Sequence, residues 1–184
     1  KLYGYLKIPA EETLLQHVKF PSPQVEDEKE NQRAIAKYII EEMKPNTVYI
    51  VGPGSTTKAI FDLLNLKKTL LGVDVLYNKK VIAKDENERG LLKILEEKPR
   101  AKIIVTPIGG QGYIFGRGNQ QISPKVIRKV GINNIIIIAT KHKLQTLKHG
   151  KLLVDTGDPN LDEELKRYFR VVTDYREEKV MVVE

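Results

Sequence analysis

The chain has 184 residues, of which 41% are hydrophobic and 30% charged, so it is long enough to fold around a sizeable core and is not a disordered or collagen-like chain. It contains no cysteine, which excludes disulfides, thiolate metal sites and a cysteine nucleophile and favours a cytoplasmic protein. Lys and Arg outnumber Asp and Glu by 31 to 24, which favours an anionic ligand, and no apolar run approaches the roughly 20 residues that cross a membrane.

Helices are predicted where an N-terminal signal precedes apolar residues spaced three or four apart. The predicted helices cover about 28–44 behind a capping box at Asp27–Glu30, Lys58–Leu66, a segment behind a second box at Asp85–Glu88, and segments behind Ser123–Pro124, Thr140 and Asp158–Pro159. The segment Lys19–Val25, which contains two prolines, is predicted to be a loop or linker.

Short β-branched runs without polar alternation lie between these helices, at Thr47–Val51, Leu70–Val75, Ile103–Thr106, Ile135–Ala139 and Leu152–Val154. Apolar strands of this kind are buried on both faces, as in a parallel sheet that is covered by helices. We therefore predict one α/β domain over residues 1–184, with an open, mostly parallel sheet and helices on both faces. The chain ends, Leu2–Ile8 and Arg170–Val183, are expected to form strands or hairpins that add antiparallel edges.

The first candidate site is a glycine loop between the strand 47–51 and the helix that follows it. A strand, a glycine turn and a helix bring bare backbone amides to a helix N-terminus, where a phosphate or carboxylate is favoured. The loop lacks the Gly-Lys-Ser/Thr ending of a Walker motif, and the alternative is a tight turn in which a hydroxyl only caps the helix. The residues predicted to bind phosphate are Gly52, Gly54, Ser55, Thr56 and Thr57.

The second candidate site is the loop 107–124, which holds five glycines within ten residues. So many glycines lose much backbone entropy on ordering, which indicates either a ligand that approaches the backbone or tight turns. The alternative is a solvated hairpin or a subunit contact. The residues predicted to form the opposing wall of the site are Gly109, Gly110, Gln111, Gly112, Arg117, Asn119 and Gln120, with the guanidinium of Arg117 as the phosphate clamp.

Three carboxylates are further candidates. Asp74, near the end of a predicted strand, is suited to a sugar hydroxyl or a metal-bound water, and the alternative is a structural turn aspartate. Asp155 and Asp158 are suited to a magnesium or ribose contact, and their alternative is a turn followed by an N-cap. The three histidines have no metal-ligand spacing, so no metal site is predicted. Only 7% of residues are aromatic and the basic residues are interleaved with acids, which does not favour nucleic acid.

Both glycine loops, together with Leu71–Val75, Phe115–Pro124 and Val154–Pro159, resemble the C-terminal half of the ATP-NAD kinase family that includes the acetoin-catabolism protein X relatives. The resemblance implies NAD, ATP or polyphosphate, and magnesium as the ligands of the whole kinase, which transfers a phosphoryl group to the ribose 2′-hydroxyl of NAD. In these kinases a Gly-Gly-Asp-Gly motif carries the catalytic aspartate, and the resemblance places it in an N-terminal half that is absent here.

The second loop contains Gly-Gly-Gln-Gly, and Gln111 cannot serve as a base. The resemblance therefore implies that this chain completes a nucleotide site and that the missing N-terminal domain is its partner. Ordinary NAD kinases differ in having a mostly β domain at this place.

Two alternatives to the kinase domain are open. The first glycine loop also resembles the phosphate loop of ribose-5-phosphate isomerases, but their Asp-Gly-Ala-Asp-Glu and Lys-Gly-Gly segments are absent. A stand-alone enzyme acting on a phosphorylated sugar is one alternative. The other is a regulatory or oligomerisation domain, in which the glycine loops are contacts within a homo-oligomer.

Overall fold

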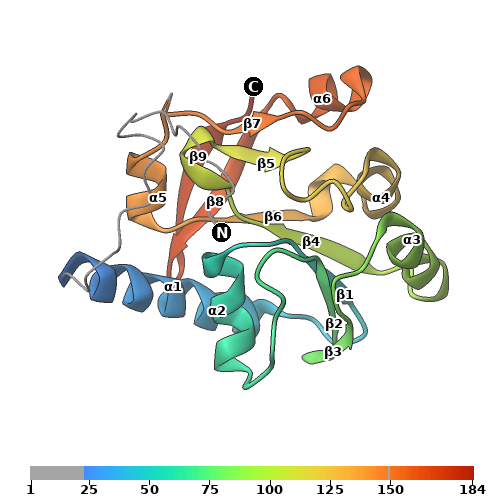
Figure 1. The fold of residues 1–184 in the computed structure, drawn as a ribbon, viewed down its shortest axis with the longest axis horizontal. Helices are drawn as coiled ribbons and strands as arrows, with labels where there is room; N and C mark the ends of the chain where they lie inside the picture. Colours follow the sequence, from blue (N-terminus) through green and yellow to red (C-terminus); the bar gives the residue numbers. More distant parts are fainter. Residues whose placement is uncertain (1–22, 149) are drawn as a thin grey trace, which may run out of the picture.

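The computed structural model describes residues 23–148 and 150–184, in which helices cover both faces of a central sheet (Figure 1). In chain order the elements are α1 (Pro23–Glu42), β1 (Val48–Val51), α2 (Ser55–Leu63), β2 (Asp74–Tyr77), β3 (Lys80–Ala83), α3 (Glu88–Glu97), β4 (Ala101–Val105), the 3-10 helix η2 (Gly109–Gln111), β5 (Tyr113–Phe115), α4 (Pro124–Val130), the 3-10 helix η3 (Ile132–Asn134), β6 (Ile135–Ile138), α5 (Lys141–Gln145), β7 (Leu153–Val154), α6 (Pro159–Leu165), β8 (Tyr168–Asp174) and β9 (Glu177–Val182). Among the described helices, none has the length and apolar character that a membrane span requires.

The main sheet has seven strands in the order β3-β2-β1-β4-β6-β8-β9. The four central strands β1, β4, β6 and β8 are parallel to one another, whereas β2, β3 and β9 are antiparallel to their neighbours and form the two edges. This arrangement confirms the predicted α/β class with an open sheet. The C-terminal segment forms the expected hairpin, β8 and β9, while the segment Leu2–Ile8 lies outside the described residues.

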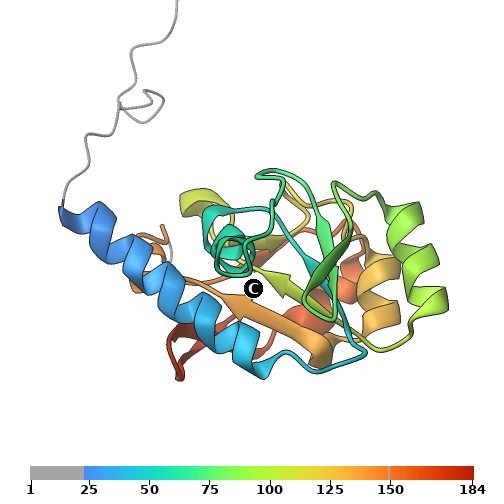
Figure 2. The same ribbon diagram turned by 90° about the horizontal axis from the view of Figure 1, so that it is seen from below.

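Alternate residues of the central strands enter two separate cores, which explains why the strands are apolar throughout. On one face, Tyr49 and Val51 of β1 pack under α1 and α2. On the other face, Val48 and Ile50 pack under α3 and α4. Figure 2 shows α1 along one side of the molecule and the neighbouring helices α3 and α4 at the other.

Several predicted helix starts are correct because a side chain caps the first turn. Ser123, Thr140 and Asp158 are the N-caps of α4, α5 and α6, and each accepts a hydrogen bond from a backbone N–H of that turn. Three predicted starts are wrong. The helix predicted over Lys58–Leu66 is α2, which begins at Ser55. The helix α1 begins at Pro23, so the box Asp27–Glu30 lies inside it and residues 23–25 are not a loop. The helix α3 is capped by Asn87, whose side chain accepts from Gly90 N, and not by the box that starts at Asp85.

The predicted strand Leu70–Val75 is also wrong. The strand there is β2, which starts at Asp74 and runs antiparallel to β1, with Asp74 opposite Val51. It continues through a two-residue turn at Asn78 and Lys79, both with positive φ, into β3, which the sequence analysis missed. Asparagine adopts this left-handed backbone readily, and it is the hairpin signal of this turn.

The segment Leu152–Val154 is not a strand of the main sheet, although Leu152 forms an isolated parallel bridge with Val183, just after β9. Its strand β7 pairs in parallel with β5, which lies within the second glycine loop, and the two form a separate small sheet. The strands approach closely because Gly116, at φ 89°, lies against Asp155, where a Cβ atom would overlap the carbonyl oxygen. A Cβ atom at Gly112 would lie 2.7 Å from the carbonyl oxygen of Lys151. These two glycines are therefore required by packing.

The change Gly116→Ala is expected to lower the free energy of unfolding by about 3 kcal/mol, since left-handed backbone strain adds to a steric overlap with Asp155. Gly157→Ala is the matched control, because Gly157 has φ 82° but nothing within 4 Å of a Cβ atom. It should lose only about 1 kcal/mol, the strain alone. Urea unfolding of both variants measures the difference, and equal losses would contradict the packing role of Gly116.

Candidate functional site

The parallel strands β1, β4 and β6 end at the same side of the sheet, which we call the carboxyl edge. It consists of the residues that follow these strands: Gly52–Ser55 after β1, Thr106 after β4 and Thr140 after β6. Figure 1 shows α2 and α5 on this side of the molecule. Open α/β sheets bind ligands at this edge, so the topology places the first glycine loop where it was expected to act.

The first glycine loop is held rigidly between β1 and β4. Gly52 N donates to Ile104 O at 2.9 Å and so extends the strand pairing into the loop. Gly54 follows at φ 125°, and a Cβ atom there would lie 2.7 Å from Cγ2 of Thr106. Only glycine fits this position, because both the backbone conformation and the contact with the neighbouring loop exclude a side chain.

The first turn of α2 has unsatisfied polar groups. Its N-cap is Gly54, so no side chain caps the helix, and the first helical hydrogen bond runs from Lys58 N to Gly54 O. The hydroxyl of Thr57 lies 2.9 Å from Gly52 O and from Gly54 O, and therefore binds the loop instead of capping the turn. Thr56 is fully buried, and its Oγ1 has no hydrogen-bond partner in the described part of the chain. A buried hydroxyl without a partner is destabilising unless a ligand or water completes it.

A cation that the sequence analysis missed lies at the same edge. Lys143 of α5 is partly buried, and its Nζ is 3.3 Å from Oγ1 of Thr106. Burial lowers the pKa of Lys143, and the negative charge of Glu28 opposes that effect. One feature of the sequence could have identified Lys143: it lies three residues after the helix N-cap Thr140, and that helix follows directly after a predicted parallel strand.

Asp74 lies at the carboxyl edge but is fully buried and occupied by donors. Its carboxylate accepts from the backbone N of Thr69 at 2.7 Å, from Thr69 Oγ1 at 2.5 Å and from Asp85 N at 2.8 Å. Lys68 Nζ donates to the carbonyls of Thr69 and Gly72, each at 3.0 Å. This network shapes the loop before β2, whose Leu70 carbonyl accepts from Gly54 N at 3.1 Å. Asp74 thus holds in place the loop before β2, which in turn is hydrogen-bonded to the first glycine loop.

The second glycine loop is largely occupied by contacts within itself and with β7. Arg117 stacks on Tyr113, 4.2 Å from the ring centroid, and its Nη2 lies 3.3 Å from Oδ2 of Asp155. Asn119 is buried, where its Oδ1 accepts from Gly116 N and its Nδ2 donates to Ile114 O. Gly109, Gly110 and Gln111 form the exposed turn η2, and Gln120 is exposed as well. Within the described residues, Arg117 forms no hydrogen bond or ion pair with the first loop.

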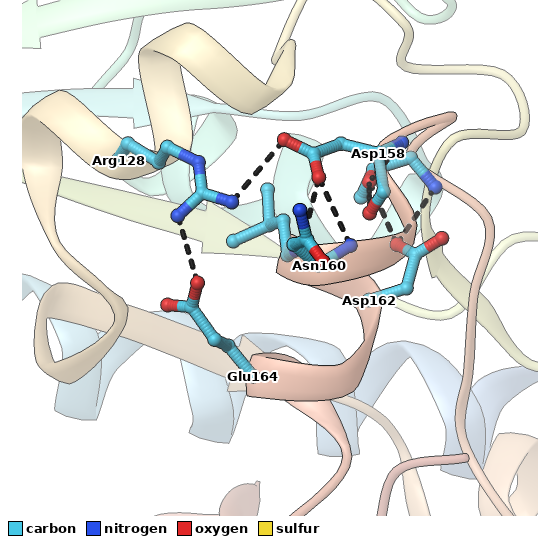
Figure 3. Close-up of polar contacts among 7 residues, drawn as sticks. Arg128, Asp158, Asn160, Asp162 and Glu164 are labelled. Atoms are coloured by element: carbon cyan, nitrogen blue, oxygen red, sulfur yellow. Dashed lines mark hydrogen bonds and ion pairs between the residues drawn. The ribbon is translucent and has the colours of Figure 1, made fainter.

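Asp158 begins α6 and joins it to α4 (Figure 3). Its Oδ1 accepts from the backbone N of Asn160 and Leu161, and its Oδ2 lies 3.2 Å from Nη2 of Arg128. The hydrogen bond from Leu161 N is the largest of the effects that lower the pKa of Asp158. Arg128 also pairs with Glu164, so one guanidinium holds both turns of the helix. The described residues contain no group of three side chains suited to hold a metal ion.

Lys68 should make stability depend on pH. Burial lowers its pKa from 10.5 to about 8, against the opposing charges of Asp74 and Asp85. Between these values the unfolded chain binds a proton that the folded chain has released, so the free energy of unfolding should rise with pH from about 8 to 10.5. Urea unfolding across this range measures it. Lys68→Met should remove this rise in the free energy of unfolding. Lys67→Met, which changes the exposed neighbouring lysine, should keep it. If the free energy of unfolding depends on pH in the same way in the wild type and both variants, the lowered pKa of Lys68 is contradicted.

The comparison with known families agrees with the resemblance predicted from the sequence. The family model of the ATP-NAD kinase C-terminal domain matches residues 45–183, which is more than half of the chain. The matched range contains both glycine loops and all seven strands of the main sheet. No curated protein and no solved structure matches the chain. The chain belongs to the ATP-NAD kinase C-terminal domain family.

Proposed function

We propose that this chain is the nucleotide-binding domain of an ATP-NAD kinase and that it binds a phosphate group of NAD or ATP at the N-terminus of α2. The observation that carries the proposal is the uncapped first turn of α2, where the buried hydroxyl of Thr56 has no partner among the described residues. The backbone N–H groups of this turn precede the first helical hydrogen bond, and among residues 23–148 and 150–184 they have no acceptor, so they can donate to an anion. The residues of this phosphate site are Gly52, Gly54, Ser55, Thr56 and Thr57.

Shape and charge both support an anionic ligand at this position. The loop 52–57 is fixed on one side by the pairing of β1 with β4 and on the other by Leu70, so its amides are already oriented. The helix dipole adds a partial positive charge at the first turn of α2. The chain as a whole carries a formal charge of +7, which attracts nucleotides from solution.

Catalysis requires more than this domain in our proposal. The phosphoryl group passes from ATP or polyphosphate to the 2′-hydroxyl of NAD, and a carboxylate base has to accept the proton of that hydroxyl. Gln111 of the second loop is an amide and cannot accept that proton, and the carboxylate of Asp74 is buried and bound by three donors. We infer that an N-terminal domain supplies the aspartate and that this chain positions the nucleotide. Magnesium would bind together with ATP, coordinated by its phosphates.

Arg117 can bind a phosphate in this proposal only if it first releases Asp155. Its guanidinium is exposed and suited to a phosphate, but Asp155 and the ring of Tyr113 already occupy it. It could reach a ligand only by exchanging its pair with Asp155. In this proposal the turn Gly109–Gln111 and Gln120 line the opposing wall, because they are exposed, with the turn held by a hydrogen bond from Lys148 N to Gly110 O at 3.2 Å.

The change Thr56→Val tests the site without disturbing its shape. Because Oγ1 of Thr56 has no partner, its removal should leave the free energy of unfolding equal or slightly higher. If the hydroxyl completes a phosphate site, the same change should weaken ligand binding by roughly five- to tenfold, the worth of about one hydrogen bond. The ligands are NAD, NADP, ATP with magnesium, ribose 5-phosphate and inorganic phosphate, and thermal melts detect binding as a raised midpoint.

Thr57→Val is the comparison for stability, since it removes the same atom from a neighbouring hydroxyl that is hydrogen-bonded within the loop. The Thr57 hydroxyl lies on two loop carbonyls, so its loss should destabilise the fold by about 1 kcal/mol. If none of these ligands raises the melting midpoint of the wild-type protein, the proposed function is refuted. A shift with ribose 5-phosphate alone would point to an isomerase-like enzyme instead.

A further inference from the structure

Lys143 differs from Lys141 of the same helix in forming no ion pair among the described residues. Lys141, two residues earlier, lies 3.0 Å from Asp174 and 2.8 Å from Glu177. Lys143 donates to the neutral hydroxyl of Thr106 and forms no ion pair within residues 23–148 and 150–184. The helix fixes its position, because its backbone N donates to the N-cap Thr140 at 3.2 Å.

An ammonium group in this environment is costly. Burial disfavours the charged form, and Glu28, the one acidic residue that opposes this effect, does not outweigh it. A methionine or leucine would fill the same space without that penalty. The fold therefore holds a charge that an anion would neutralise, at the same edge of the sheet as the phosphate site.

Thr106 connects this charge to the first glycine loop. Its Oγ1 accepts from Lys143 at 3.3 Å, while its Cγ2 occupies the space that a side chain at Gly54 would need. One residue thus contacts both the lysine of α5 and the N-cap of α2. The buried hydroxyl of Thr56 and the free N–H groups of the first turn follow directly after that N-cap. Thr106 therefore lies between the ammonium group of Lys143 and the residue from which α2 begins.

We propose that Lys143 supplies the cation of the phosphate site at the N-terminus of α2, with Thr106 as the positioning residue that holds its ammonium group beside Gly54. This inference rests on the proposed function and names the side chain that neutralises the ligand. The ligand class is a phosphate ester or phosphoanhydride, as in a nucleotide. Arg117, the cation expected from the sequence, is paired with Asp155, whereas Lys143 has no carboxylate partner in the described part of the chain.

The test measures binding by the full chain with Lys143→Met, which keeps the length of the side chain and removes the charge. The probes are inorganic phosphate, pyrophosphate, NAD, and ATP with magnesium. The affinity of each protein for each probe is measured by titration calorimetry. A hydrogen bond to a charged group corresponds to roughly a 10- to 100-fold change in affinity, so Lys143→Met should weaken each probe that the wild type binds by at least about tenfold. Lys148→Met, which removes an exposed charge just after the same helix, should stay within about twofold.

A second measurement keeps the inference testable if Lys143→Met does not fold. In the wild type, acetylation of lysines is followed residue by residue by mass spectrometry, with and without the bound probe. A bound phosphate should slow acetylation of Lys143 several-fold and leave Lys148 unchanged. This readout reports contact with the ligand and does not respond to a purely structural role.

The outcomes separate this inference from the proposed function. If the wild type binds no probe, both are overturned. If the wild type binds, but Lys143→Met binds equally well and the probe does not protect Lys143, the phosphate site stands and the role of Lys143 is overturned. A tenfold loss in Arg117→Met without any loss in Lys143→Met would assign the cation to the second loop instead.

Discussion

The contact between Gly54 and Thr106 is the constraint on which the carboxyl edge depends. It exists because β1 and β4 are hydrogen-bonded in parallel, so the loops that follow them leave the sheet side by side. Gly52 continues the pairing for one residue beyond β1, and Gly54 then turns the chain into α2 where a side chain would not fit. The direction of α2, and with it the direction of its free N–H groups, is thereby set by the sheet and not by a capping side chain.

Two lysines with lowered pKa values flank this loop, and their surroundings assign them different roles. Lys68 is enclosed by backbone carbonyls, with Asp74 and Asp85 nearby, so its charge is used within the fold to shape the loop before β2. Lys143 has only the hydroxyl of Thr106 as a hydrogen-bond acceptor among the described residues. Burial lowers the pKa of both lysines, but among the described residues Lys68 has two hydrogen-bond acceptors and Lys143 has one.

The sequence predicts the central strands and the capped helices well because their signals are local. A continuous apolar run marks a strand that is buried on both faces, and Ser123 before a proline marks a helix start. It fails where the deciding contacts are distant in the chain. Nothing near Leu70–Val75 indicates that Asp74 begins an antiparallel strand, and nothing near Lys143 indicates that Thr106, 37 residues away, receives its ammonium group.

The two glycine loops show why composition alone does not distinguish packing from binding. The second loop is richer in glycine and in polar side chains, yet many of these residues make contacts within the fold. Gly116 leaves room for the backbone of Asp155 next to β7, Asn119 accepts from Gly116 N across the turn, and Arg117 pairs with Asp155. The first loop has fewer such residues, but the buried hydroxyl of Thr56 that follows it has no partner among the residues that the structure describes. Since folded chains pair nearly all of their buried polar groups, an unpaired group at the edge where open α/β sheets generally bind ligands is a stronger reason to propose a site than glycine content is.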